Sequence, residues 1–315
     1  MAQVFASSHT PVLYQEVLHM LAPRPGGRYI DGTLGGGGHA LGILAASAPD
    51  GRLLGLDADP TAATRVRQLL APFGDRAIVL HANFRRLAEL APQYGFAQVE
   101  GVLLDLGLSS FQLDAPGQGF SFQQDAPLDM RFDPAQGVSA ADVVNTFEER
   151  ALADILYRFG EERLSRRIAR SIVARRPIHS TMALAEVISR AVGGRKGERL
   201  HPATRSFQAL RIYVNEELAA LEEALPQAIA LLKPGGVLAV ITFHSLEDRI
   251  VKHYFRRESQ ACLCPPEWPV CQCGHHASIE LVQNRGVTPG AQEVAENPRS
   301  RSARLRGARK LKINN

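Results

Sequence analysis

The stretch YIDGTLGGGGH, at Tyr29–His39, decides the predicted fold. Its apolar start ends at the acidic Asp31, five of the next seven residues are glycine, and a helical pattern follows at Ala40–Ala48. Glycine adopts positive φ and lets the backbone approach a ligand that side chains would exclude. A helix start adds free N–H groups and the positive end of a dipole. A strand, a glycine loop and a helix in this order are typical of a nucleotide-type site in a parallel α/β sheet.

The acidic residues Asp31 and Asp57 say more about the identity of the cofactor than the glycines do. The pattern Gly35-x-Gly37-x-x-Ala40 fits a dinucleotide site, but alone it is a weak signal, and a tight structural turn is the alternative. The next apolar segment ends at Asp57, where an acid suits the ribose hydroxyls of an adenosine cofactor. Asp31 favours S-adenosylmethionine (AdoMet) over NAD, because a carboxylate repels a pyrophosphate and attracts an ammonium and a sulfonium. The alternative for Asp31 is a cap on the turn.

The composition is that of a soluble globular protein. The chain has 315 residues, 45% of them hydrophobic and 22% charged, which is enough for one large domain or two. Neither a signal-peptide pattern nor an apolar run of membrane-spanning length occurs. We therefore expect a cytoplasmic protein with no membrane partner. The sequence leaves the oligomeric state open.

The net charge of +4 conceals two basic segments. Residues 135–215 hold 14 Lys and Arg against 8 Asp and Glu, and residues 297–315 hold 7 basic residues and no acidic one. The remainder of the chain therefore carries a net charge of about −9. Basic segments on an acidic body favour a polyanionic partner such as a nucleic acid. Solvated helix faces and a charged tail are the alternative.

Apolar segments alternate with helical patterns in the two outer parts of the chain. This alternation predicts a parallel sheet that is covered by helices on both faces. Strands are expected at residues 28–34, 53–57, 77–81, 99–106, 237–243, 279–282 and 303–311. Further helices are expected at residues 60–70, 218–232 and 246–258.

An insertion separates the fourth and fifth predicted strands. It begins with a loop rich in Gly, Pro, Asp and Gln and becomes wholly helical from Ser139, with a predicted capping box at Thr146-x-x-Glu149. An arginine-rich helix is expected within Arg163–Arg176. The predicted domains are residues 1–112 and 216–315, which form the sheet, and residues 113–215, an inserted helical subdomain for substrate recognition.

Besides the glycine loop, four further motifs are specific: LDLGLSSFQL (Leu104–Leu113), GFSF (Gly119–Phe122), PLDMR (Pro127–Arg131) and FHSLEDR (Phe243–Arg249). Together these motifs resemble the bacterial RsmH (MraW) family. The resemblance covers nearly the whole chain and implies a Rossmann-like class I AdoMet-dependent methyltransferase sheet with an inserted all-helical subdomain. It also implies methylation of N4 of a cytidine in 16S ribosomal RNA of the small ribosomal subunit, near the decoding P site. Phe111 is a departure, because family members often have proline there.

The resemblance also implies which residues contact the cofactor. AdoMet contacts are expected at Gly37, Gly38, His39, Asp57, Phe84, Asp105 and Gln112. Asp57 should bind the ribose hydroxyls unless it caps a helix. Phe84 should lie against the adenine unless it packs in the core, and Gln112 should bond the polar edge of the cofactor unless it belongs to a surface loop.

Asp105 is the candidate catalytic residue. It ends the fourth predicted strand, at the edge where α/β sheets bind ligands. A cytosine amine is a poor nucleophile, because its lone pair is delocalised into the ring, and an acceptor for its N–H would help to localise that pair. Asp105 either does this or holds the cofactor's amino group. His244 and Ser245 could contact the substrate at the same edge, and Phe120 and Phe122 could stack on a flipped base or pack in a core.

All four cysteines fall in one segment, as Cys262-x-Cys264 and Cys271-x-Cys273. Four thiolates would make a tetrahedral zinc site, and free thiols are the alternative. His275 or His276 could replace a ligand, whereas a reducing cytosol disfavours disulfides.

Other classes of protein fit the sequence less well. The alternative function is an AdoMet-dependent methyltransferase of another nucleic acid or of a small substrate, and the basic segments argue against the small substrate. A non-enzymatic RNA-binding scaffold conflicts with the intact glycine loop, Asp57 and Asp105. A dehydrogenase conflicts with Asp31, which disfavours a pyrophosphate.

Overall fold

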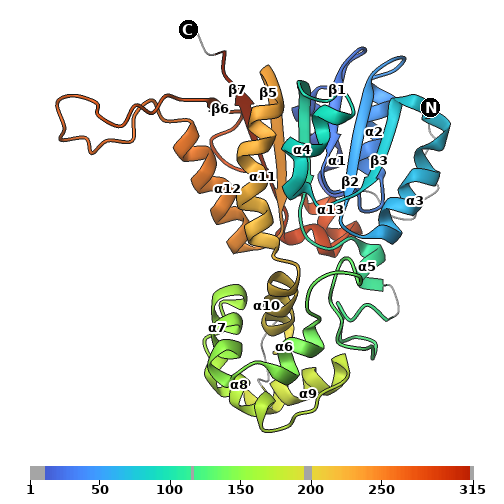
Figure 1. The fold of residues 1–315 in the computed structure, drawn as a ribbon, viewed down its shortest axis with the longest axis vertical. Helices are drawn as coiled ribbons and strands as arrows, with labels where there is room; N and C mark the ends of the chain where they lie inside the picture. Colours follow the sequence, from blue (N-terminus) through green and yellow to red (C-terminus); the bar gives the residue numbers. More distant parts are fainter. Residues whose placement is uncertain (1–10, 115–116, 195–200, 313–315) are drawn as a thin grey trace. The chain divides into compact units, whose positions relative to one another are not determined.

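The computed structural model describes residues 11–114, 117–194 and 201–312. The chain divides into two compact units (Figure 1). The sheet unit comprises Met1–Gly107 and Leu218–Asn315, and the helical unit comprises Leu108–Glu217. The helical unit is thus inserted in the sheet unit, whereas the sequence placed the limits of the insertion at residues 113 and 215.

The sheet unit is built on a seven-stranded sheet with strand order β3-β2-β1-β4-β5-β7-β6. The strands are β1 (Arg28–Asp31), β2 (Arg52–Asp57), β3 (Ala77–His81), β4 (Val99–Asp105), β5 (Leu232–Thr242), β6 (Ile279–Leu281) and β7 (Arg304–Lys310). The first five are parallel, and β7 pairs antiparallel with both β5 and β6. The order reverses between β1 and β4, and such a reversal opens a ligand crevice at the carboxyl ends of the strands.

Helices cover both faces of this sheet (Figure 1). They are α1 (Tyr14–Leu21), α2 (Gly38–Ala46), α3 (Pro60–Leu70), α4 (Leu87–Gln93), α11 (Glu217–Leu231), α12 (Ser245–Glu258) and α13 (Ala291–Glu296), with 3-10 turns η1 (Ala71–Arg76), η2 (Phe84–Arg86) and η3 (Pro298–Ser302). Ile30 and Leu54 pack with residues of α4, α11 and α12, whereas Tyr29 and Leu53 pack with residues of α1, α2 and α3. Because side chains alternate along a strand, strands buried on both faces are continuously apolar.

The helical unit has its own apolar core. Its helices are α5 (Ser110–Asp114), α6 (Ala140–Thr146), α7 (Glu149–Gly160), α8 (Ser165–Val173), α9 (Thr181–Ala191) and α10 (Thr204–Val214). Val143, Leu156, Ile168, Leu184 and Leu210 are fully buried in one cluster and come from five different helices. Each helix thus buries one face of its helical repeat.

The predicted capping box at Thr146 and Glu149 is wrong. Thr146 ends α6, and its hydroxyl donates to the carbonyl of Asp142 at 2.7 Å. The capping box lies one helix earlier, where Asp142 N–H donates to Ser139 Oγ at 3.1 Å and Ser139 N–H donates to Asp142 Oδ2 at 2.8 Å. The motif failed because threonine also bonds back to the carbonyl four residues earlier at the end of a helix.

The architecture confirms the expected α/β class, a Rossmann-like sheet with an inserted all-helical subdomain. Element boundaries differ by a few residues from those predicted. Strand β1 ends at Asp31 instead of residue 34, because the chain turns away at the glycine loop. Helix α2 starts at Gly38, two residues earlier than predicted. Within the described residues, no helix is both long and apolar enough to cross a membrane.

Candidate active site

Three aspartates end neighbouring strands of the sheet. Asp31 is the last residue of β1, Asp57 of β2 and Asp105 of β4. Because β1 lies between β2 and β4 and all three run parallel, the three carboxyl groups share one edge of the sheet. Glu247, in the first turn of α12 after β5, is close enough for its charge to act on Asp105. The site is therefore an acidic edge built from four elements.

Thr33 joins the ends of β1 and β4. Its N–H donates to Asp31 Oδ1 at 3.1 Å, and its hydroxyl oxygen accepts from the N–H of Asp105 at 2.6 Å. Packing favours glycine at position 32, because a Cβ there would come within 2.6 Å of the Leu104 side chain. Thr33 was not singled out by sequence reasoning, since a threonine in a loop gives no signal by itself.

Asp57 fixes the glycine loop to the end of β2. Its Oδ2 accepts from Gly35 N–H at 2.7 Å, and its Oδ1 accepts from Asp59 N–H at 2.8 Å. The helix cap that was the alternative role for Asp57 is Asp59, whose Oδ1 accepts from Thr61 N–H at 2.8 Å at the start of α3. A carboxylate oxygen has two lone pairs, so Asp57 can accept further donors.

Packing within the protein requires glycine at positions 37 and 38. Gly37 is the N-cap of α2 and has a φ of 82°, in the left-handed region that favours glycine. A Cβ on Gly37 would lie 3.1 Å from Val66, and one on Gly38 would lie 2.3 Å from Pro11. Because Gly37 has no side chain, the N-cap leaves the N–H groups of the first turn to other partners, and such groups suit a polar or anionic ligand group.

His39 lies in the first turn of α2, buried beside Asp105. Its Nε2 is 3.6 Å from Asp105 Oδ2, and its ring stacks on Tyr14 with centroids 6.1 Å apart. Burial lowers the pKa of His39 to about 4, so the ring is neutral at pH 7. Neither ring nitrogen has a hydrogen-bond partner of good geometry among the described residues. The neutral imidazole therefore adds no positive charge beside Asp105.

Burial makes the carboxyl groups of this edge hard to ionise. It raises the pKa of Asp31 to about 7, with the charge of Asp57 adding to the effect, and it raises the pKa of Asp57 to about 6. The pKa of Asp105 lies well above its usual range, first because of burial and then because of Asp31 and Glu247. A positive charge that entered this site would lower all three pKa values and relieve their mutual repulsion.

Two buried oxygens of this edge lack partners. Asp31 Oδ2 and Asp105 Oδ1 have no hydrogen bond within the part of the chain that the structure describes, and no lysine or arginine there forms an ion pair with either residue. Buried polar atoms are normally bonded, so an unpartnered pair of acceptors indicates the place of a ligand's donors. The residues present therefore fit a cationic ligand with N–H groups.

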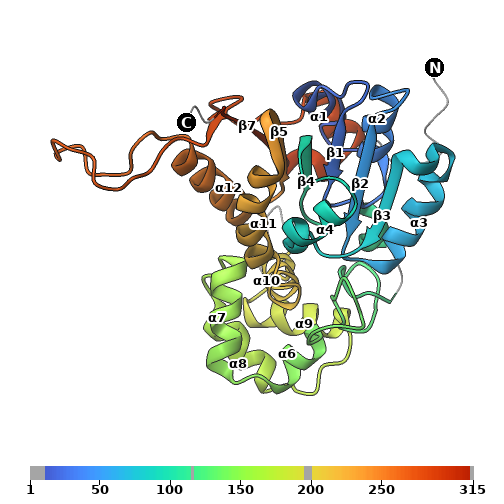
Figure 2. The same cartoon turned by 45° about the horizontal axis from the view of Figure 1, so that its top comes forward.

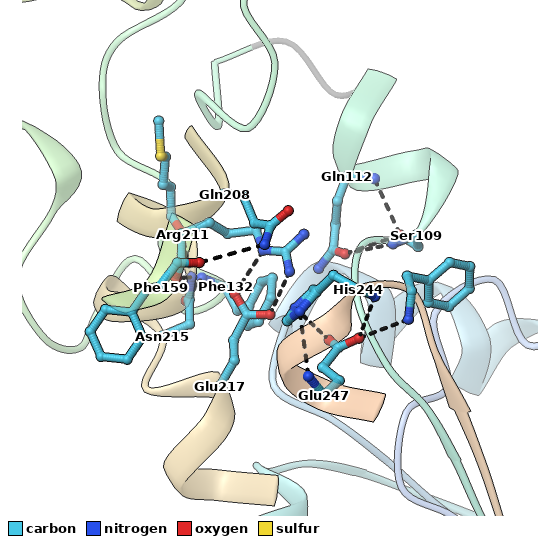
Figure 3. A network of polar contacts seen from close by, with 12 residues as sticks. Ser109, Gln112, Phe132, Phe159, Gln208, Arg211, Asn215, Glu217, His244 and Glu247 are labelled. Atoms are coloured by element: carbon cyan, nitrogen blue, oxygen red, sulfur yellow. Dashed lines mark hydrogen bonds and ion pairs between the residues drawn. The ribbon is translucent and has the colours of Figure 1, made fainter. Parts of the chain in front are cut away.

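Phe84 and Gln112 lie in different units. Phe84 opens η2 after β3 and borders the glycine loop, since its Cβ is 3.2 Å from where a Cβ on Gly32 would lie. It is partly buried against the core of the sheet unit. Gln112 is buried in the helical unit, where its Oε1 accepts from Ser109 N–H at 3.0 Å (Figure 3). Gln112 is thus not the surface-loop residue that was its alternative.

A family model described as the MraW methylase family matches residues 6–311 of this chain. The chain belongs to the MraW methylase family. A ribosomal RNA small subunit methyltransferase H of Thermomicrobium roseum is 55% identical over 309 residues, covering 97% of this chain and 94% of that protein. A protein of the same name from Dehalococcoides mccartyi is 52% identical, covering 96% of this chain and 86% of that protein. Another, from Syntrophotalea carbinolica, is 52% identical, covering 96% of this chain and 98% of that protein. The protein is therefore a methyltransferase.

In this MraW methylase His244 caps α12. Its Nδ1 accepts from Glu247 N–H at 3.4 Å, and Glu247 Oε2 accepts from Phe243 N–H at 2.8 Å and from His244 N–H at 3.3 Å (Figure 3). The Nε2 of His244 lies 3.0 Å from Glu247 Oε1. Sequence reasoning missed Glu247, because histidine is not a usual N-cap and the pair does not look like a capping box.

Phe120 and Phe122 pack inside the helical unit of the methylase. The Phe120 ring lies 5.6 Å from that of Phe132, centroid to centroid. The Phe122 ring lies 4.6 Å from His201 and 4.8 Å from Phe207. Of the two roles that the sequence left open, these contacts support core packing.

The arginine-rich segment of the methylase is mostly exposed. Arg163, Arg166 and Arg167 are exposed and form no ion pair among the described residues. Arg170 is 77% exposed, and its Nε lies 3.6 Å from an acid of α7. Arg176 instead has a structural role, since it donates to two backbone carbonyls at 2.7 and 2.5 Å. The basic residues at positions 195, 196 and 199 lie outside the described residues.

The basic C-terminal segment is partly paired inside the sheet unit. Arg306 is 11% exposed and donates two hydrogen bonds to Asp248, at 2.7 and 3.0 Å. Arg309 pairs with Glu280 at 3.2 Å, and Lys310 donates to two backbone carbonyls. The sequence suggested a second basic surface here, and two carboxylates, Asp248 and Glu280, offset part of the charge of β7 within the fold.

Proposed function

We propose that this methyltransferase uses AdoMet to methylate N4 of a cytidine in 16S ribosomal RNA of the small ribosomal subunit, near the decoding P site. Its relatives at 52–55% identity are named ribosomal RNA small subunit methyltransferases. The observation that carries the proposal is the buried acidic edge formed by Asp31, Asp57 and Asp105 beside a glycine loop. Such an edge suits a ligand with a sulfonium and an ammonium group and disfavours a pyrophosphate.

Several residues around this edge would each bind one part of AdoMet. When bound, AdoMet supplies a methyl group on a sulfonium. The backbone of Gly37, Gly38 and His39 borders the ligand at the start of α2. Asp57 accepts from the ribose hydroxyls with the lone pairs that Gly35 and Asp59 leave available. Phe84 would lie against the adenine, and the contact of Gln112 with the polar edge of the cofactor stays a prediction from the family resemblance.

Asp105 serves the target amine in this proposal. Bond formation at N4 leaves the nitrogen with one proton too many, and a carboxylate at the edge of β4 can hold the amine N–H beforehand and accept that proton afterwards. The neutral ring of His39 lies 3.6 Å from Asp105 and adds no positive charge beside that carboxyl group. If Asp105 instead only holds the amino group of the cofactor, its substitution by asparagine should change AdoMet affinity and leave turnover at saturating AdoMet unchanged.

The helical unit supplies the contacts to RNA. Its exposed Arg163, Arg166 and Arg167 extend from the start of α8 without partners in the described residues. Exposed arginines in such density suit the phosphates of RNA, because guanidinium groups bind them in pairs of hydrogen bonds. We assign residues 113–215 to substrate recognition on this ground. An enzyme that acts on ribosomal RNA works where ribosomes are assembled, so we place it in the cytoplasm.

A methylation assay tests the whole proposal. Small ribosomal subunits from a strain that lacks the corresponding gene are incubated with the protein and AdoMet, and nuclease fragments of the RNA are weighed by mass spectrometry. We expect one added methyl group per subunit, on N4 of a single cytidine near the P site. Methyl transfer to another base, or to a small molecule but not to subunits, would overturn the proposed substrate.

A charge reversal tests the assignment of the helical unit. We expect the Arg166→Glu/Arg167→Glu variant to lose RNA affinity and methylation together while AdoMet affinity stays unchanged. Each lost phosphate contact should reduce the salt slope of RNA binding by about 0.7. The Arg24→Glu/Arg86→Glu variant changes the net charge equally, at exposed positions of the sheet unit, and serves as the control. Equal losses in both variants would show a general charge effect instead of a specific surface.

A further inference from the structure

The loop that joins α12 to β6 carries all four cysteines of the chain. It extends away from the sheet (Figure 2). Its apolar side chains do not form a core, since Leu263, Trp268 and Val270 are 42%, 51% and 68% exposed. A loop of this length without a core needs some other source of order, such as a metal ion or a covalent link.

The four thiol groups converge on one point from two arms of the loop. All four Sγ atoms lie within 4.8 Å of one another. Cys262 Sγ lies 3.4 Å from Cys271 Sγ and 3.8 Å from Cys273 Sγ, and the last two are 3.6 Å apart. In a tetrahedron of sulfur ligands about 2.3 Å from a zinc ion, neighbouring sulfurs are about 3.8 Å apart. The thiols thus already have roughly the spacing of such a site.

Backbone N–H groups point at the sulfurs as they do at anionic acceptors. The N–H of Cys264 donates to Cys262 Sγ at 3.3 Å, Leu263 N–H donates to Cys273 Sγ at 3.4 Å, and Gln272 N–H donates to Cys264 Sγ at 3.3 Å. Such N–H groups hold three of the sulfurs in place and would stabilise metal-bound thiolates, because a donor stabilises the negative charge of its acceptor. Thiolates are the form in which cysteine binds a metal.

Two other arrangements fit these contacts less well. Disulfide sulfurs are about 2.05 Å apart, far closer than any measured pair in this cluster. His275, a possible substitute ligand, is turned to the end of α12, where its Nε2 lies 3.0 Å from the carbonyl oxygen of Arg257. The set that converges is therefore the four cysteines alone, and sulfur-only tetrahedral sites select zinc or iron.

We propose that Cys262, Cys264, Cys271 and Cys273 bind one Zn²⁺ ion in a structural site. Binding replaces the thiol protons, which pass to solvent, and involves no oxidation or reduction. Because all four positions are filled by protein, no place remains for water or substrate on the metal, as in other structural zinc sites.

The ion would order the tip of a loop whose base is already fixed. Ser278 N–H donates to the carbonyl of Glu258 at 2.9 Å, and His275 contacts the carbonyl of Arg257, so the two ends of the loop are joined at α12. Loss of the metal should therefore disorder residues 262–273 and leave the sheet unit and its active site folded.

The chain offers two reporters that belong to this loop alone. Trp268 is the only tryptophan, and the four cysteines are the only thiols. We expect the purified protein to contain one zinc per chain by elemental analysis. Its four thiols should react with a colorimetric thiol reagent only after a chelator is added, and Trp268 fluorescence should change in the same step. Cobalt added to the metal-free protein should give the visible absorption of a tetrahedral thiolate site.

Two variants test which residues of the loop bind the zinc ion. Cys262→Ser/Cys271→Ser should lose the zinc and keep AdoMet affinity, whereas His276→Ala should keep one zinc per chain. Four thiols that react at once in metal-free protein, with no uptake of added zinc, would overturn the proposal. So would thiols that appear only after dithiothreitol, which would show disulfides, or iron in place of zinc. Loss of zinc from the His276→Ala variant would overturn the four-cysteine set.

Discussion

Asp31→Asn should make the unliganded protein more stable while weakening AdoMet binding. The buried Asp31 has a pKa of about 7, against 3.8 for an ordinary aspartate. This pKa difference of roughly three units corresponds to about 4 kcal/mol of unfavourable charge burial, at about 1.4 kcal/mol per unit. Asparagine keeps the acceptor for the N–H of Thr33 and places its amide nitrogen where Asp31 Oδ2 has no partner. Burial of that amide without a partner costs about 1–3 kcal/mol, so a net gain of about 1–3 kcal/mol remains.

The sign of the effect depends on pH. Below pH 4 the folded and unfolded chains both carry a protonated Asp31, and the substitution removes no charge. As the pH rises toward 7, the unfolded chain loses this proton while the folded protein keeps it, so the wild type loses about 1.4 kcal/mol per pH unit through this group. Above pH 7 the loss is constant. The advantage of the asparagine variant should therefore grow by about 3 kcal/mol between pH 5 and pH 8.

Thermal unfolding at the two pH values measures this difference. We expect the Tm of the variant to exceed that of the wild type by roughly 2–5 °C at pH 8, and by clearly less at pH 5. Calorimetry should show weaker AdoMet binding at pH 8. Asp75→Asn, which removes an exposed carboxylate, controls for net charge. An Asp31→Asn variant that is less stable than the wild type at pH 8, or equally shifted at both pH values, would refute the reasoning.

Three other substitutions test separate parts of the molecule. Asp57→Ala should weaken AdoMet binding by roughly 10–100-fold, because charge-assisted hydrogen bonds contribute about 1.5–3 kcal/mol, and unchanged calorimetric affinity would rule out the ribose contact. Asp105→Asn should lower turnover at saturating AdoMet more than it lowers affinity; a change in Kd alone would leave Asp105 as a binding residue. Arg176→Ala should destabilise the protein by about 1–3 kcal/mol in denaturant unfolding, because it strips two carbonyls of their donor, whereas the exposed Arg167→Ala should change stability by less than about 0.5 kcal/mol.

The strands were predictable because a strand buried on both faces is recognisable as a short run of apolar residues in the sequence. Leu53–Leu56 is buried on both faces, so its uninterrupted apolar run reports a parallel sheet without any knowledge of its partners. The placement of Asp31, Asp57 and Asp105 on one edge follows from the same pattern, since each acid directly follows such a run. Local sequence therefore carried both the class of the fold and the acidic part of the site.

What the sequence did not reveal depends on contacts between distant residues. The partners of Asp105 are Thr33 and His39, which lie far from it in the chain. The pairing of Arg306 depends on Asp248, 58 positions away, so a count of charges along the chain could not show that this arginine is buried in an ion pair. Likewise, Arg176 looked like its exposed neighbours until the carbonyls that it binds were placed beside it.

The position of β7 in the sheet has a consequence for synthesis of the protein. β7 covers the edge of β5 and, among the described residues, is the strand that links β6 to the sheet, yet it is made last among the strands. Roughly 70 residues separate the end of β5 from the end of β7, and a ribosome takes ~4–14 s to add them. During that interval β5 presents an unpaired apolar edge, the kind of surface that seeds aggregation. The strand that finally closes it is rich in arginine and lysine, so a nascent chain with β7 truncated should remain a client of chaperones.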